Sequence, residues 1–249
     1  MQEISLPAFH AGDVTSLVGP NAAGKSTLMR ALAGLLPATG SVRLQGRELI
    51  GRPLVEWSRR VTYMPQSLPQ GVALNVLESV ISALRASPMG ATAPQRAALE
   101  RSAVEVLERV GIIHLAMESL QHLSGGQRQL VSLAQVLARE PRVLLLDEPI
   151  SALDLQYQLR VMRLVHELAR ERGMIVLIVL HDLSIAARWS DGIVMLSRGG
   201  VAATGTPAEA ITSETLARVY GVSASVECCA KGRLQITIED VLDDDAAFR

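Results

Sequence analysis

The segment GPNAAGKST at residues 19–27 constrains this chain more than any other feature. It follows the apolar run VTSLV and precedes a stretch with helical periodicity. Gly19 and Gly24 permit a tight turn at a helix start, where backbone N–H groups and the helix dipole favour an anion. Lys25 adds a charge for phosphate oxygens, and the Ser26 hydroxyl suits Mg²⁺. The segment therefore predicts a nucleotide phosphate site, and a glycine-rich turn with a surface lysine is the alternative. The residues predicted to hold the nucleotide here are Gly19, Pro20, Asn21, Ala22, Ala23, Gly24, Lys25, Ser26 and Thr27.

Length and charge narrow the class of protein. The 249 residues are enough for one large α/β domain with an inserted subdomain. The net charge is −1, with 24 basic and 25 acidic residues and no basic block, so we expect no nucleic-acid partner. The longest strictly apolar run, residues 174–180, is far shorter than the roughly 18–20 residues that span a bilayer, and no signal peptide opens the chain. We expect a cytoplasmic protein, or one docked from that side on a membrane protein.

Hydrophobic patterning predicts alternating strands and helices. Short runs rich in Val, Ile and Leu indicate strands that are covered on both faces. Between them lie amphipathic stretches, which is the pattern of a mostly parallel sheet with crossover helices. From about residue 71 to 122 the strand pattern gives way to helix, which indicates a helical insertion. The predicted strands are 14–18, 143–146, 175–180 and 193–196, and the predicted helices are about 26–36, 129–139, 154–172 and 183–189.

Polar residues follow several of these predicted strands. In open parallel sheets ligands bind beyond the carboxyl ends of strands, so these residues and the phosphate segment could converge. Asp147 fits a Mg²⁺ partner opposite Ser26, and Glu148 fits a base that polarises water. His181 would reach a γ-phosphate. Gln66 by itself indicates no function, and it becomes a candidate only because these other residues are present. The alternatives are a helix-capping acidic pair, a core histidine and a surface glutamine.

The segment LSGGQ at residues 123–127 carries a second pattern. Ser124 and Gln127 have the spacing of a helix capping box, so the segment could simply start a helix. However, Gly125 and Gly126 are poor for helix stability and good for exposing amides to an anion. If the first phosphate segment already holds a nucleotide, this one would face the nucleotide of another subunit. That arrangement predicts a two-fold dimer with ATP between the chains.

Taken in order, these motifs resemble one family. The set comprises GPNAAGKST, Gln66, LSGGQ, VLLLDEP, SALD at 151–154 and His181. It is similar to the ATP-binding subunits of ABC transporters over roughly residues 4–221. The resemblance implies a RecA-like P-loop NTPase core with a mostly parallel sheet and an inserted helical subdomain.

Further expectations follow from this resemblance. It implies an ATP-binding domain over residues 1–221, with the helical subdomain at about 71–139 and a C-terminal extension at 222–249. It also implies dimerisation on ATP, integral membrane permease subunits, an external substrate-binding protein, and a peripheral position on the cytoplasmic face of the membrane. Gln66 would contact Mg²⁺ and lie at the junction with the membrane subunits, and Asp154 would lie at the dimer seam.

The sequence also departs from the family pattern. Ala22 stands where glycine is usual, a small change that we expect to be tolerated if φ there is negative. Leu130 replaces a common basic residue, so a helix-surface contact should differ. The family places an aromatic residue for adenine stacking well before the phosphate segment, whereas residues 1–14 look like the strand pair directly before it. Finally, the adjacent Cys228 and Cys229 are expected to be reduced structural thiols rather than a metal site.

The C-terminal half is most similar to the ATPases of bacterial iron–siderophore importers, with haem and vitamin B12 importers next. The likeness lies in residues 153–165, 181–191 and 205–222, none of which is expected to contact cargo. Two other classes remain open. A soluble ABC-type ATPase acting on DNA or ribosomes would usually carry two such domains or basic extensions. A regulatory module without turnover would tend to lose the carboxylate that Glu148 supplies.

Overall fold

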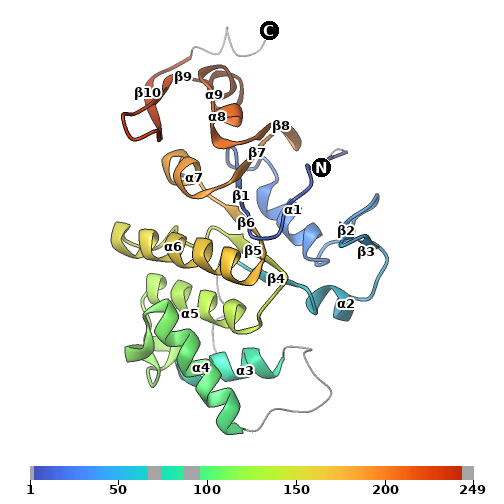
Figure 1. Ribbon diagram of the computed structural model, residues 1–249, viewed down its shortest axis with the longest axis vertical. Helices are drawn as coiled ribbons and strands as arrows, with labels where there is room; N and C mark the ends of the chain where they lie inside the picture. Colours follow the sequence, from blue (N-terminus) through green and yellow to red (C-terminus); the bar gives the residue numbers. More distant parts are fainter. Residues whose placement is uncertain (1–2, 67–73, 87–95, 243–249) are drawn as a thin grey trace. The chain divides into compact units, whose positions relative to one another are not determined.

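The computed structural model describes residues 3–66, 74–86 and 96–242 (Figure 1). The chain divides into two compact units, residues 1–28 with 169–249 and residues 29–168. Helices α1 (Lys25–Leu32) and α6 (Leu155–Arg172) contain the points of division. The proline- and glycine-containing segment SPMGATAP at 87–94 and the acidic residues 243–245 lie outside the described residues.

The first unit is built around a central buried strand. Strand β1 (Val14–Val18) is parallel to both β6 (Ile175–Val179) and β7 (Gly192–Ser197). All five residues of β1 are buried, as the unbroken apolar run predicts for a strand covered on both faces. Strand β8 (Gly200–Gly205) is antiparallel to β7, which gives the order β6-β1-β7-β8. The carboxyl end of β1 leads directly into the phosphate segment.

Short capped helices and a hairpin complete this unit. The helices are α7 (Leu183–Trp189), α8 (Pro207–Ala210) and α9 (Ser213–Tyr220). Strands β9 (Val222–Cys228) and β10 (Leu234–Val241) pair antiparallel, and β9 packs against α9. The Leu242 N–H donates to the Gly221 carbonyl at 2.8 Å, so the hairpin closes on the end of α9. Cys228 and Cys229 are free thiols of this hairpin, and Cys228 is exposed rather than packed in a core.

The second unit joins two parallel strands to a group of helices. Strand β4 (Val61–Met64) pairs with β5 (Val143–Asp147), with Val61 opposite Val143. Helices α3 (Val76–Arg85), α4 (Arg96–Val110) and α5 (Gly125–Ala138) pack side by side (Figure 1). The shorter elements of this unit are β2 (Arg43–Leu44), β3 (Arg47–Glu48), α2 (Leu54–Ser58), and the 3-10 turns η1 (Ile113–Leu115) and η2 (Leu120–His122).

Several predicted boundaries differ from the structure. The strand pair predicted at residues 1–14 is wrong, because residues 3–13 contain no strand and β1 begins at Val14. Pro7 lacks a backbone donor, and Gly12 has φ +93°, which breaks an extended strand. Helix α1 ends at Leu32 rather than at 36, because Gly34 follows with φ +71°.

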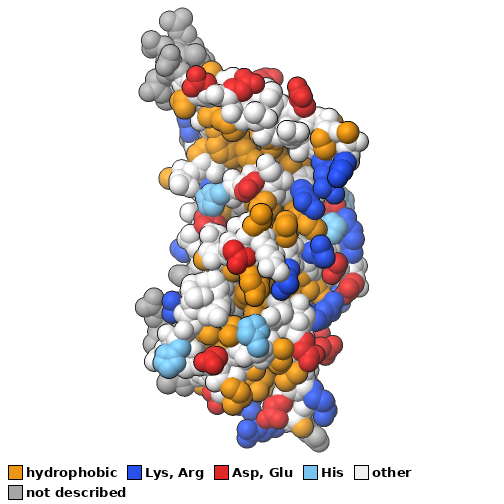
Figure 2. Space-filling view, turned by 90° about the vertical axis from the view of Figure 1, so that its left-hand side faces the viewer, with side chains coloured by type: hydrophobic (Ala, Val, Ile, Leu, Met, Phe, Trp, Pro, Cys, Tyr) orange, Lys and Arg blue, Asp and Glu red, His pale blue; other side chains and the backbone are white. Residues whose placement is uncertain are grey.

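The surface carries both signs of charge. Acidic and basic side chains occur together over the face shown in Figure 2, with hydrophobic side chains between them. Within the described ranges, every helix is either too short or too polar to cross a lipid bilayer.

Candidate functional site

The phosphate segment forms a tight turn between β1 and α1. Gly19 has φ +141°, and a Cβ added to it would lie 2.1 Å from the Leu196 carbonyl oxygen of β7, so only glycine fits. Gly24 has φ +102° and directly precedes the first residue of α1. The first N–H groups of a helix make no bonds within it, so the turn presents a helix N-terminus to whatever lies above it.

Lys25 is drawn into this turn. Its side chain is buried, with 6% exposure, and its ammonium donates to the Gly19 carbonyl at 2.7 Å and to the Pro20 carbonyl at 2.9 Å. A buried ammonium needs such partners. The positive charge therefore lies against the loop backbone, at the place where the sequence predicts phosphate oxygens.

Ala22 has a left-handed backbone. Its φ is +62°, so the condition under which an alanine is expected to be tolerated here, a negative φ, is not met. A left-handed conformation costs a residue with a Cβ about 1–2 kcal/mol, and glycine would avoid that cost. The turn keeps the conformation of a glycine even though the sequence supplies an alanine.

Tyr220 contacts the same turn from α9. The Gly19 N–H donates to its phenol oxygen, while burial raises the pKa of the phenol to about 12. Because Tyr220 lies next to Gly221, where the C-terminal hairpin closes, the hairpin supports the turn indirectly. Its sequence context gave no indication of this contact.

The acidic strand end lies in the second unit. Asp147 is 1% exposed, and its carboxylate accepts a hydrogen bond from the Tyr63 hydroxyl at 2.8 Å. Burial raises the pKa of Tyr63, the nearby Asp147 adds to that shift, and a hydrogen bond from Arg30 opposes it. The phenol therefore stays neutral and keeps its proton for the carboxylate.

Glu148 follows directly and adopts φ +53°. Its carboxylate accepts a hydrogen bond from the exposed Gln66 side chain at 2.7 Å. The structure thus brings Gln66 and Glu148 together, as their positions after neighbouring strands suggested. Lys25, Ser26 and His181 lie in the other unit, where His181 precedes the Asp182 cap of α7.

The LSGGQ segment forms the capping box predicted for it. Ser124 Oγ accepts from the Gln127 N–H at 3.2 Å, and Gln127 Oε1 accepts from the Ser124 N–H at 2.8 Å. Helix α5 therefore begins at Gly125 rather than at 129. A Cβ on Gly126 would lie 2.9 Å from the Ala152 carbonyl oxygen, whereas one on Gly125 would meet no atom within 4 Å. Gly126 serves packing, and Gly125 borders open space.

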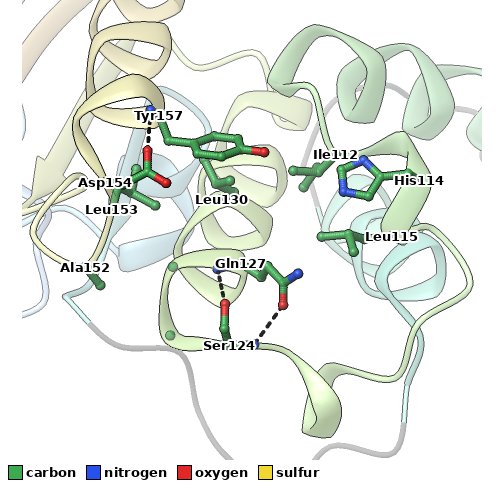
Figure 3. Close-up of a pocket in the computed structure, with 12 residues that line it drawn as sticks. Ile112, His114, Leu115, Ser124, Gln127, Leu130, Ala152, Leu153, Asp154 and Tyr157 are labelled. Atoms are coloured by element: carbon green, nitrogen blue, oxygen red, sulfur yellow. Dashed lines mark hydrogen bonds between the residues drawn. The ribbon is translucent and has the colours of Figure 1, made fainter.

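That open space is a cavity of about 500 Å³ (Figure 3). Its floor is the start of α5, and Tyr157 and His114 extend into it from opposite sides. Asp154 lines it as well and caps α6 by accepting from the Tyr157 N–H at 3.0 Å. Leu130 is buried in its wall, so the departure predicted for this residue is an apolar cavity wall rather than a changed surface contact.

One further residue of α5 escaped the sequence analysis. Gln129 is buried and bonds to the chain on both sides of Ile150. A glutamine within an amphipathic helix has no pattern that separates it from a surface residue. Only its hydrogen bond to the Glu148 carbonyl in the structure identifies it as part of the site.

A phosphate turn at a helix start, an acidic strand end with a paired glutamine, and a capped glycine-rich helix define a P-loop nucleotide hydrolase. The chain belongs to the ABC transporter family, whose model matches residues 2–151. It is an ATPase, because the members of this family and the relatives of this chain are transporter ATPases that hydrolyse ATP.

Relatives of known function extend over most of the chain. The hemin import ATP-binding protein HmuV of Bordetella avium is 38% identical over 234 residues, covering 91% of this chain and 88% of its own. The ferric enterobactin transport ATP-binding protein FepC of Escherichia coli K12 is 37% identical over 216 residues, covering 86% and 79%.

Solved structures confirm the predicted fold. A metal-chelate type ABC transporter in an inward-facing conformation matches with a TM-score of 0.74 at 26% identity, covering 95% of this chain and 88% of the other. The dimeric ATP-binding cassette MJ0796, bound to ADP and Pi after hydrolysis, matches with a TM-score of 0.73 at 27% identity. The match covers 81% of this chain and 88% of the other. The prediction of a P-loop core with a mostly parallel sheet is therefore correct.

Proposed function

We propose that this chain binds ATP with Mg²⁺ at the phosphate turn and hydrolyses it with Glu148 as the base. The observation that carries the proposal is the pair of carboxylates at the end of β5. Asp147 accepts a hydrogen bond from Tyr63, and Glu148 accepts one from Gln66. In the proposed site Gly19–Thr27 hold the phosphates and His181 contacts the γ-phosphate.

Oxygen ligands at this site suit Mg²⁺. Mg²⁺ is usually held by one or two protein oxygens together with substrate phosphates, and it neutralises their charge. Ser26 and Asp147 supply such oxygens, and Gln66 would contribute a third. Within the described ranges no three or more His, Cys, Asp or Glu residues gather into a metal site, so a cage built from protein side chains alone has no support there.

Glu148 and Gln66 would then act on the attacking water. A carboxylate within hydrogen-bond reach of water accepts its proton and orients it for in-line attack. The Gln66 amide donates to one Glu148 oxygen at 2.7 Å, which would orient the carboxylate towards the attacking water. Lys25 would stabilise charge on the phosphates.

The LSGGQ cavity supports a shared site between two copies. Gly125 borders a space of about 500 Å³ at a helix N-terminus, where a phosphate is favoured. We place the nucleotide of a second ATPase subunit there, with Asp154 near the seam. The dimeric form of MJ0796 is consistent with such a pairing. In this scheme residues 1–221 form the ATP-binding domain, with the helical subdomain at about 71–139 and the extension at 222–249.

Transport of iron chelates is the proposed role. The named relatives act in hemin import and ferric enterobactin transport, and one solved relative is of the metal-chelate type. We propose that the chain lies on the cytoplasmic face of the membrane and powers import of iron–siderophore complexes through permease subunits. An external binding protein would deliver the complexes to these subunits. Haem is the second candidate, and several hemin import relatives favour it.

Phosphate release by the purified chain tests the catalytic assignment. Lys25→Ala should weaken ATP binding, because it removes charge from the phosphates in the ground state. Glu148→Gln should bind ATP and lose at least about 10²-fold in hydrolysis. Near-normal turnover in Glu148→Gln would overturn the assignment.

Uptake in cells tests the cargo. Deleting the gene should abolish uptake of labelled ferric siderophore while other iron sources still enter. Unchanged siderophore uptake with loss of labelled haem uptake would move the assignment to haem.

A further inference from the structure

We propose that Gln129 is a positioning residue for Glu148, acting through the Glu148 main chain rather than on substrate. This inference rests on the proposed role of Glu148 as the base. It arises from a set of hydrogen bonds that joins α5 to the segment after β5.

The contacts are specific to this side chain. Gln129 Nε2 donates to the Glu148 carbonyl at 2.5 Å and to Ser151 Oγ at 3.3 Å. Gln129 Oε1 accepts from the Ala152 N–H at 3.1 Å. Gln129 is 7% exposed, so these bonds are made largely away from water, where a lost partner is costly. Both ends of the amide are used, which fixes its orientation.

The Glu148 backbone needs such support. Its φ of +53° is a conformation that residues with a Cβ avoid, so surrounding contacts must hold it. Its carbonyl accepts from Gln129 and also from Ser151 Oγ at 3.1 Å. Since φ sets the direction of the Cα–Cβ bond, the contacts that fix this backbone also aim the carboxylate.

The consequence falls on turnover rather than on binding. Among the described residues, the Gln129 side chain bonds only to Glu148, Ser151 and Ala152, and it makes no hydrogen bond to the phosphate turn. Misplacing a catalytic group by about 1 Å can cost on the order of 100-fold in rate. We therefore expect loss of Gln129 to lower kcat and to leave ATP affinity almost unchanged.

Gln129→Met tests this, because methionine keeps the length of the side chain and removes its amide. Gln158→Met is the matched control, since Gln158 Nε2 donates to the Ile150 carbonyl of the same segment at 3.2 Å. We expect Gln129→Met to lower kcat roughly 10- to 100-fold, with an ATP Kd within about twofold of wild type, and Gln158→Met to stay near wild type. A kcat for Gln129→Met within about twofold of wild type would overturn the inference.

A double variant separates positioning from a merely structural role. If Gln129 acts through the Glu148 carboxylate, adding Gln129→Met to Glu148→Gln should lower single-turnover hydrolysis no further. If the two losses multiply, Gln129 does not act through Glu148 and the inference fails. An inactive Glu148→Gln beside a normal Gln129→Met would overturn this inference alone and leave the proposed function standing.

Thermal unfolding shows whether each variant is folded. Should Gln129→Met fail to fold, Ser151→Ala removes the other side-chain donor to the Glu148 carbonyl from an exposed position. It should lower kcat by roughly 3- to 10-fold, again without effect in the Glu148→Gln background. A normal kcat in Ser151→Ala would then count against the inference.

Discussion

The Tyr63 phenol donates to the Asp147 carboxylate, with 2.8 Å between Tyr63 Oη and Asp147 Oδ2. The bond joins the parallel partners β4 and β5 close to their carboxyl ends. A buried carboxylate without a donor is expensive, so this phenol offsets part of the cost of burying Asp147 where Mg²⁺ is proposed to bind.

Removal of that phenol should therefore lower stability. We expect Tyr63→Phe to reduce the free energy of unfolding by about 1–3 kcal/mol, the range for a hydrogen bond to a buried charged group. Urea unfolding at neutral pH measures it. Tyr157→Phe is the control, because its phenol makes no hydrogen bond within the described residues, and equal losses in both variants would contradict the assignment.

The phosphate turn offers a stabilising substitution. Ala22 has φ +62°, so Ala22→Gly should raise the free energy of unfolding by about 0.5–1 kcal/mol. This gain arises because the backbone strain that glycine relieves in the folded state exceeds the cost of the extra conformational entropy that glycine gives the unfolded chain. The neighbouring Ala23 is buried and is not left-handed, so Ala23→Gly should instead destabilise. Urea midpoints of the two variants should move in opposite directions, and a shared direction would refute the explanation.

The two glycines of LSGGQ should separate assembly from stability. Gly125→Ala places a methyl group in open space, so it should leave stability unchanged or slightly raised. If the cavity takes the nucleotide of a partner subunit, the Glu148→Gln protein should form a dimer with ATP, and Gly125→Ala should weaken that dimer. Gly126→Ala brings its Cβ to 2.9 Å from the Ala152 carbonyl oxygen and should lower stability. Light scattering with ATP and with ADP measures assembly. A full-strength ATP dimer in Gly125→Ala would argue that the cavity binds no partner nucleotide.

Acid stability should depend on Glu48. Its carboxylate accepts from Ser41 Oγ and from the N–H groups of Val42, Ile50 and Leu49, which lowers its pKa to about 2. A lowered folded pKa gives stability that is present above the unfolded value near 4.5 and is lost as pH falls through about 2. The urea midpoint of Glu48→Gln should accordingly change less than that of wild type between pH 5 and 2. Parallel curves would contradict the assignment.

Much of the fold followed from local pattern. The runs that became β1, β5, β6 and β7 are apolar and rich in branched residues, and such runs have few alternatives once a phosphate turn follows the first of them. The capping box at Ser124 was also predictable, because its two hydrogen bonds depend only on a spacing of three residues.

What escaped prediction depends on distant contacts. The left-handed φ of Ala22 and Glu148 is imposed by the surrounding chain, and neither residue type announces it. Gln129 and Tyr63 acquire their roles only from partners that are brought to them by the parallel pairing of β4 with β5 and by the packing of α5. Hydrogen bonds between side chains that lie far apart in the sequence produce no periodic pattern of residues from which they could be predicted.

The place of β1 between β6 and β7 has a consequence during synthesis. This strand ends at Val18, but its sheet partners end at Val179 and Ser197 and are made much later. At about 5–20 residues per second, a ribosome needs on the order of ten to thirty seconds to supply them. For that time an apolar strand and an unfinished phosphate turn lie outside the ribosome without their neighbours. The nascent chain is thus exposed to aggregation and to chaperones until Ser197 has been made.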